Sequence, residues 1–203
     1  MSPAPAPTAS VAAFVGTFAL MTAAIAGLLL FDLFLARIDR RESAAHASNL
    51  YADGVSLLAE HQPATAAGRF AAAVAIDRSN TNYALALAEA KLEEGQTSEA
   101  EATLRELLER AENDGAVSMV MARTLERSGR PEEAKVYYHR AIFGRWGADS
   151  VERRREARFA LIDLLAKGGS GPELLAELLP FEDTPPDSVA LRERLAKLFI
   201  LAG

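Results

Sequence analysis

The sequence predicts an all-α protein in which one N-terminal, membrane-length helix precedes a solenoid of helical hairpins. Two observations predict this fold. Small and apolar residues recur at intervals of 34 positions over the middle of the chain, and a long uncharged stretch precedes them. The 203 residues are 50% hydrophobic but only 7% aromatic, a composition that suits helices rich in alanine and leucine.

The N-terminal stretch has the length of a membrane span. Val11 to Phe31 contains no charged residue and no proline, and about 21 residues at about 1.5 Å each can cross a hydrocarbon core of roughly 30 Å. No Lys or Arg precedes it, and its apolar run is longer than that of a signal peptide. We therefore predict a short disordered tail over residues 1–10 and an uncleaved single transmembrane helix over residues 11–35.

The residues that flank this stretch predict its orientation. Arg37, Arg40 and Arg41 follow it at once, whereas residues 1–10 carry no Lys or Arg. Positive flanks stay on the cytoplasmic side, so we expect a basic juxtamembrane helix over residues 36–46 and a domain in the cytoplasm. A periplasmic domain is the alternative, and a chain without cysteine gives no disulfide to decide between them.

Small residues follow one face of the predicted span at steps of three and four. Because small residues let helix backbones approach closely in lipid, this face is a candidate packing surface for another membrane helix. Its members are Ala12, Gly16, Ala19, Ala23 and Ala26. The alternative is that an alanine-rich protein carries alanines on every face.

Four independent columns of residues keep the 34-residue period. They are Gly54, Ala88 and Ala122; Ala66, Ala100 and Ala134; Phe70, Leu104 and Tyr138; and Ala73, Leu107 and Ala141. Between the first and second columns lie His61, Gly95 and Gly129, where one helix should end and the next begin. Each unit is therefore a predicted helical hairpin. Such a hairpin cannot bury its apolar stripe alone, so the units must stack on one another.

This pattern resembles the tetratricopeptide repeat (TPR). The third unit matches best, through Ala122, Leu125, Gly129, Ala134, Tyr138 and Ala141, and the first nearly as well, through Leu50, Gly54, Leu57, Ala66, Phe70 and Ala73. The second departs at Lys91, where the family favours an aromatic residue or leucine, although Leu92 can fill the gap. The resemblance implies three TPR-like repeats over residues 47–145, in a membrane-anchored member of the family.

The period slips after the third unit. Residues 144–149 are rich in turn formers, and a helix is predicted over residues 151–167. A short helix over residues 173–179 follows Pro172, prolines from Pro180 onward predict a loop, and Ser188 begins a last helix. We interpret residues 146–203 as a degenerate fourth repeat plus a terminal helix, which is either a capping helix or half of a further unit.

No pattern of residues indicates catalysis or a cofactor. The chain has no cysteine, its histidines are scattered, and it contains no phosphate loop, nucleophile elbow or zinc-binding helix. The net charge of −6 and the absence of a basic, aromatic stripe argue against nucleic acid. We therefore predict a protein that is not an enzyme, with no catalytic or metal site, no cofactor and no small-molecule substrate.

The resemblance places a protein-binding groove on the first helix of each hairpin. The implied residues are Tyr51, Val55, Leu58, Asn82, Leu85, Glu89, Met119, Arg123 and Arg127. Some members of the family hold the carboxylate terminus of chaperones with a clamp of Lys and Asn. Here Tyr51 and Val55 occupy the first clamp positions, which argues against a receptor for chaperone tails.

These observations predict a membrane-anchored TPR scaffold that serves as an accessory or assembly subunit of a larger membrane complex, such as a respiratory, photosynthetic or secretion complex. Its expected partners are other membrane proteins and the lipid around the span. The alternatives are a TPR receptor or co-chaperone, or a periplasmic biogenesis factor, that binds peptides transiently in its groove.

Overall fold

The computed structural model describes the backbone of residues 8–183 and 188–203, and the side chains of residues 18, 21, 22, 27–34, 36–182 and 188–203. Every element in this part of the chain is an α-helix, apart from one isolated bridge between Asp114 and Arg145. Contacts between Cα atoms divide the chain into two units, Met1–Asn49 and Leu50–Gly203. The predicted all-α fold is confirmed.

Helix α1 runs from Thr8 to Ala59. The large apolar side chains described between Phe18 and Phe34 are all more than half exposed. Over the part of the chain that the structure describes, no helix is both long and apolar enough to cross a membrane. The side chains of the predicted packing face (Ala12, Gly16, Ala19, Ala23 and Ala26) and residues 1–7 of the predicted tail lie outside the described residues.

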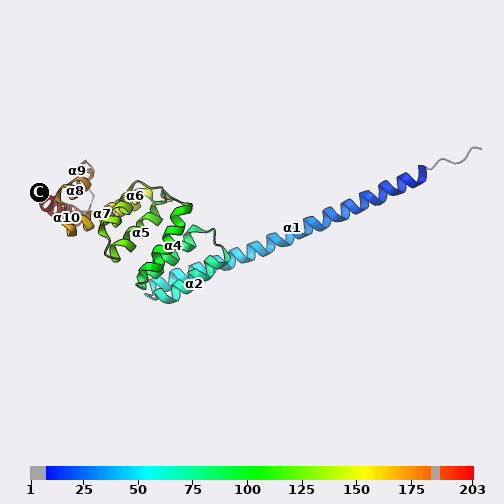
Figure 1. The fold of residues 1–203 in the computed structure, drawn as a ribbon, viewed down its shortest axis with the longest axis horizontal. Coiled ribbons are helices and arrows are strands. Elements are labelled where there is room, and N and C mark those ends of the chain that lie inside the picture. The colour runs from blue at the N-terminus through cyan, green and yellow to red at the C-terminus, as the bar shows by residue number, and fades with distance from the viewer. Residues whose placement is uncertain (1–7, 184–187) are drawn as a thin grey trace, which may run out of the picture. The chain divides into compact units, whose positions relative to one another are not determined.

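Residues 50–203 fold into successive helical hairpins that pack side by side along the chain (Figure 1). The first hairpin joins the end of α1 to α2 (Pro63–Ile76); the next three pair α3 (Thr81–Glu93) with α4 (Thr97–Arg110), α5 (Gly115–Arg127) with α6 (Pro131–Phe143), and α7 (Ser150–Gly168) with α8 (Gly171–Leu178). A short α9 (Pro180–Asp183) and the last helix α10 (Val189–Ala202) follow. We refer below to the first helix and the second helix of each hairpin.

The turn inside each of the first three hairpins repeats the same backbone hydrogen bond. A backbone N–H donates a hydrogen bond to the carbonyl five residues earlier, and the residue directly before the donor has a positive φ. This combination is the Schellman motif at the C-terminal end of a helix. The bonds join Gln62 to Leu57, Gln96 to Lys91 and Arg130 to Leu125, with N···O distances of 2.9, 2.8 and 2.9 Å. The left-handed residues are His61, Gly95 and Gly129, with φ of 58°, 88° and 72°, at the three positions that the sequence predicted.

The four sequence columns form the contact between the two helices of each hairpin. Every member of these columns is buried. At Gly54 the approach is closest, because a Cβ atom there would lie 2.5 Å from the ring of Phe70, which is itself fully buried. In the second unit Lys91 stands where the repeat favours a large apolar residue, and Leu92 fills the core there as the sequence suggested. Leu92 is 2% exposed, and the Lys91 Nζ atom lies 2.6 Å from Glu99.

The fourth hairpin keeps the same columns, but with a longer step from the third hairpin than the regular period. Gly129 corresponds to Gly169, Ala134 to Leu174, Tyr138 to Leu178 and Ala141 to Phe181; Gly169 has a φ of 73°, and the three others are buried. The extra length lies mainly in the first helix, since α7 has 19 residues where α5 has 13. The degenerate unit of the sequence is thus a regular hairpin with an insertion near its start.

The loop between α6 and α7 is held by Trp146. Its indole Nε1 donates a hydrogen bond of 2.7 Å to the carbonyl of Ala141, and its ring lies against Gly115, where any Cβ would come within 2.4 Å. The Arg145 N–H also donates to the carbonyl of Asn113, and the Gly115 N–H to that of Arg145. Trp146 therefore packs against the third hairpin at the point where the chain leaves it.

One prediction for the C-terminal region is wrong. The sequence predicted a loop from Pro180 onward, but Pro180 begins the short helix α9. Proline is compatible with the first turn of a helix, where its missing N–H has no partner within the helix to lose. The last helix begins after Ser188, whose side-chain oxygen accepts a hydrogen bond from the Leu191 N–H.

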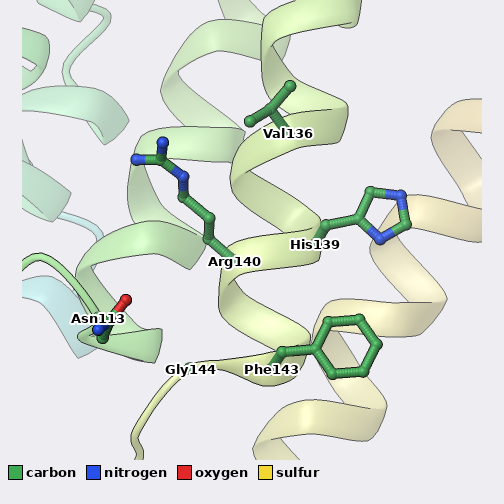
Figure 2. Close-up of a pocket in the computed structure, with 6 residues that line it drawn as sticks. All are labelled: Asn113, Val136, His139, Arg140, Phe143 and Gly144. Carbon is green, nitrogen blue, oxygen red and sulfur yellow. The ribbon is translucent and has the colours of Figure 1, made fainter.

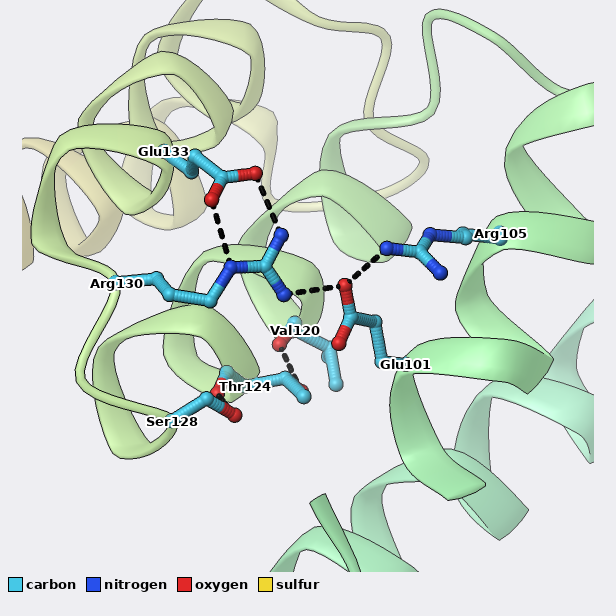
Figure 3. A network of polar contacts seen from close by, with 7 residues as sticks. All are labelled: Glu101, Arg105, Val120, Thr124, Ser128, Arg130 and Glu133. Carbon is cyan, nitrogen blue, oxygen red and sulfur yellow. Dashed lines mark hydrogen bonds and ion pairs between the residues drawn. The ribbon is translucent and has the colours of Figure 1, made fainter. Parts of the chain in front are cut away.

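The side chain of Arg130 ties the third hairpin to the second. Arg130, at the start of α6, donates to Glu101 of α4 at 2.7 Å and to both carboxylate oxygens of Glu133 at 2.6 Å (Figure 3). The same Glu101 oxygen accepts from Arg105 at 2.5 Å, and its side chain is only 13% exposed. Hydrogen bonds from Arg130 lower the pKa of Glu133.

Two matched glycine substitutions test the close approach inside the first hairpin. Gly54→Ala should lower the free energy of unfolding by about 1–2 kcal/mol, because overpacking against the buried Phe70 ring outweighs the gain in helix propensity. Gly68→Ala on α2 meets nothing within 4 Å and should raise stability by about 0.5–1 kcal/mol. Urea unfolding followed by circular dichroism measures both. Equal effects of the two substitutions would contradict the packing argument.

Candidate protein-binding surface

The predicted groove residues all lie in the unit formed by residues 50–203, on three consecutive first helices. Five of them are half-buried: Tyr51 and Leu58 on α1, Leu85 and Glu89 on α3, and Met119 on α5. The other four are exposed: Val55, Asn82, Arg123 and Arg127. The repeat places these side chains in register, because residues at the same position of successive units occupy equivalent places on neighbouring helices.

One column of this surface is apolar along its whole length. Tyr51, Leu85 and Met119 occupy the same position of three successive units, and Phe159 follows Met119 by the longer step of the fourth hairpin. All four side chains are half-buried, with one side against the core and the other toward solvent. Phe159 was not among the predicted groove residues, because the longer step hides it from a search at the regular period.

The N-terminal end of this column is aromatic. The Tyr51 ring centroid lies 5.6 Å from that of Phe70 and 5.3 Å from that of Tyr83. Tyr83 belongs to α3 and was missed in the sequence, because its column holds Asn49 and Val117 and so shows no aromatic pattern. Two hydroxyl-bearing rings on a half-buried surface offer both apolar area and hydrogen-bonding groups, as protein-binding surfaces commonly do.

The adjacent column is charged in its later units. It contains Val55, Glu89, Arg123 and, by the longer step, Asp163. Burial raises the pKa of Glu89, and the positive charges of Arg123 and Arg153 partly oppose that effect. Arg153 lies in the part of α7 that extends beyond the length of α5, so the insertion of the fourth hairpin adds a positive charge near Glu89.

Arg127 has a structural role besides its predicted place in the groove. Its guanidinium donates a hydrogen bond of 2.5 Å to the Leu92 carbonyl at the C-terminal end of α3. In the same way Arg110 donates to the carbonyl of Arg78 at 3.1 Å. Each arginine donates to a carbonyl near a helix end of the preceding hairpin, which is a stabilising contact between units.

A second candidate surface lies on the outer side of α6, where the structure has a hollow of about 460 Å³ (Figure 2). Its lining includes Val136, His139, Arg140 and Phe143 from one side of the helix, and Asn113 and Gly144 close it. Phe143 is 76% exposed. The sequence carried a signal for this surface, since Val136 and Phe143 are large and apolar in columns that otherwise hold glycine, alanine and glutamate.

The described residues show no arrangement that would hold a metal ion. No group of three His, Cys, Asp or Glu side chains comes together in that part of the chain. The carboxylate of Glu177 lies beside basic side chains instead, 3.6 Å from Arg158 and 3.7 Å from the His139 imidazole. The chemistry of both surfaces is therefore that of apolar contact and surface charge.

The family model of the tetratricopeptide repeat matches residues 57–124. The protein is an all-α, TPR-like helical solenoid. No curated protein matches the chain. TPR-type repeats are generally non-catalytic scaffolds.

Solved structures share this fold. A tetratricopeptide repeat protein from Parabacteroides merdae ATCC 43184 superposes with a TM-score of 0.59 at 15% identity, over 77% of this chain and 60% of that one. YrrB, a TPR protein with an unusual peptide-binding site, superposes with a TM-score of 0.53 at 16% identity, over 83% of this chain and 95% of that one. At these identities the similarity establishes the arrangement of the helices.

The half-buried carboxylate of Glu89 in the groove can be tested by its effect on stability. Because its pKa is raised above the ordinary value of 4.5, Glu89 keeps a proton in the folded state that the unfolded chain releases. Stability from this group is therefore highest below that value and falls as the pH rises through the folded pKa. Glu89→Gln should raise the melting temperature at pH 7 and change it little at pH 4.

The matched control is Glu112→Gln, which removes an exposed loop carboxylate. It should leave the melting temperature nearly unchanged at both pH values. A lower melting temperature of Glu89→Gln at pH 7 would mean that attraction to Arg123 outweighs the cost of burial.

Proposed function

We propose that this protein is a membrane-anchored TPR scaffold that acts as an accessory or assembly subunit of a larger membrane protein complex. The observation that carries the proposal is the apolar character of α1 on all sides over residues 28–31. Leu28, Leu29, Leu30 and Phe31 are consecutive, and each is between 57% and 67% exposed. Consecutive residues of a helix point about 100° apart, so these four side chains surround the axis.

A single protein partner on one side could not cover such a helix, whereas lipid surrounds a span completely. The uncharged run from Val11 to Phe31 has the length that a bilayer requires, and Arg37, Arg40 and Arg41 follow it as a basic flank. An anchor of this kind would hold the interaction surface of residues 50–203 beside other membrane proteins. The small residues Ala12 to Ala26 on one face would support packing against a partner helix.

A transient peptide receptor is the second candidate, and the half-buried apolar column of Tyr51, Leu85, Met119 and Phe159 favours it. YrrB, with its peptide-binding site, has the same arrangement of helices. In this function the groove alone would determine activity and the span would serve only as an anchor. The two candidates differ in whether the sequence of the span matters.

Purification from native membranes tests the leading proposal. A tagged protein solubilised in mild detergent should keep a stoichiometric set of integral membrane proteins, identified by mass spectrometry and seen as one large species on blue-native electrophoresis. Replacing residues 11–31 by an unrelated leucine-alanine helix of equal length should release these partners and leave the protein in the membrane. If the unmodified protein ran only as a free monomer on blue-native electrophoresis, the subunit role would be refuted. If the protein with the replaced span kept its partners, the receptor would be favoured.

The basic flank predicts a cytoplasmic location for residues 50–203. In sealed, right-side-out vesicles, added protease should then leave this domain intact and digest it only after the membrane is opened. Digestion in intact vesicles would place the domain on the opposite side, as a periplasmic biogenesis factor requires.

A further inference from the structure

The surface of the first helices combines the apolar column with two charged side chains of opposite sign. Glu89 on α3 and Arg123 on α5 hold the same position in successive hairpins, and their charges act on each other. Within the part of the chain that the structure describes, neither side chain forms an ion pair or a hydrogen bond. A partner that carries one sign of charge, such as nucleic acid or an anionic bilayer, can complement only one of them.

The C-terminal end of both columns is already engaged within the domain. The guanidinium carbon of Arg194 on α10 lies 5.5 Å from the centroid of the Phe159 ring, and Arg194 forms an ion pair with Asp163. The Phe159 ring centroid also lies 4.9 Å from that of Phe181. The open part of the surface is therefore formed by the first three hairpins, over Tyr51, Leu85 and Met119.

The spacing of the first helices determines which conformation of a partner fits along the apolar column. Neighbouring first helices contact each other, as α3 and α5 do, and packed helices have axes about 8–10 Å apart. Seven residues of an α-helix advance about 10.5 Å and return to nearly the same side of its axis. A β-strand covers this distance in about three residues, but an odd spacing turns successive side chains to opposite faces. Every seventh residue of a helix therefore meets the next member of the column.

The polar groups of the surface distinguish a helix from an extended chain with three residues per turn. Such a polyproline II chain would match the spacing, but it has no internal hydrogen bonds, so its backbone needs partners wherever it loses water. Of the nine predicted groove residues only Asn82 carries a side-chain amide, and Leu85 and Met119 carry no hydrogen-bond donor. An α-helix brings its backbone hydrogen bonds with it. The surface therefore favours a helical partner.

We propose that the first helices of the first three hairpins bind an amphipathic α-helix of a partner protein, with an apolar residue at every seventh position over Tyr51, Leu85 and Met119. On its adjoining side, also seven residues apart, the partner carries a basic residue facing Glu89 and an acidic residue facing Arg123. A helix of about 15 residues spans the three hairpins. The inference rests on the proposed scaffold role and names the kind of segment that the scaffold recognises.

Synthetic peptides added to the full chain in detergent test the spacing. The first is three heptads long, with leucines seven residues apart and one Lys and one Glu at the facing positions. The second has the same composition and its leucines five residues apart, which places them about 140° from one another around the helix. The first should bind at least about tenfold more tightly by fluorescence anisotropy and gain helical circular dichroism on binding. Equal Kd values would overturn the proposal.

Two matched arginine substitutions locate the site. Met119→Arg should weaken binding of the heptad peptide by at least about tenfold, because it places a charge in the apolar column. Val136→Arg replaces an exposed apolar residue on the second helix α6 and should leave the Kd unchanged. Equal effects of the two substitutions, or tighter binding of a proline-rich peptide with an apolar residue at every third position, would overturn the proposal.

A change of charge preference tests the facing residues in either orientation of the peptide. Arg123→Glu should make the protein prefer a heptad peptide with two lysines at the facing positions over the Lys and Glu peptide. Arg69→Glu, which changes an exposed arginine on α2, should keep the original preference. An unchanged preference in Arg123→Glu would overturn the assignment of the charged residues.

The same peptides separate this inference from the proposed membrane role. If the heptad peptide binds as expected while the protein from native membranes is a free monomer, the helix-binding surface stands and the role in a membrane complex fails. If integral membrane partners co-purify with the protein and remain in Met119→Arg, and the peptide does not bind, the helix-binding surface fails and the role in a complex stands.

Discussion

The close approach of two helices inside each hairpin is the constraint on which the solenoid depends. Gly54 leaves no room for even a Cβ atom beneath the Phe70 ring, and the corresponding alanines of the next two hairpins are fully buried. Because interiors pack densely, a small residue on one helix requires a large one on the other, and this pairing fixes how the helices cross. The turns, the stacking of hairpins and the surface of the first helices follow from that crossing, repeated along the chain.

Much of this architecture could be predicted from the sequence because the constraint acts at the same positions in every unit. The positive φ of His61, at the position of Gly95 and Gly129, shows that the period identifies a turn even where glycine is absent. The fourth hairpin was recognised only as degenerate, since its insertion lengthens the step from the third hairpin and so removes the columns from alignment. A regular period requires every repeat to have the same number of residues. Packing requires only that the corresponding side chains of the two helices come into contact.

The interaction surface was less predictable than the core, for physical reasons. Apolar residues such as Leu85 and Met119 are placed by the helix period, and their half-buried state follows from it. A long side chain can reach several partners, and no pattern indicates that Arg127 bonds the Leu92 carbonyl. The hollow beside Phe143 depends on where the loops around Asn113 and Gly144 lie, which is a property of tertiary structure. The placement of the nine predicted groove residues follows the repeat, and their role in binding stays a prediction.

The charges of Glu89, Arg123 and Asp163 alternate along units whose cores are otherwise similar. Hairpins built on one pattern could in principle stack in the wrong sequence or exchange between chains, since their cores are nearly equivalent. Omission of the third unit would bring Glu89 next to Asp163, two carboxylates where the native array places a guanidinium between them. The charged column thus distinguishes otherwise similar neighbours, and it disfavours an arrangement in which Glu89 and Asp163 become neighbours.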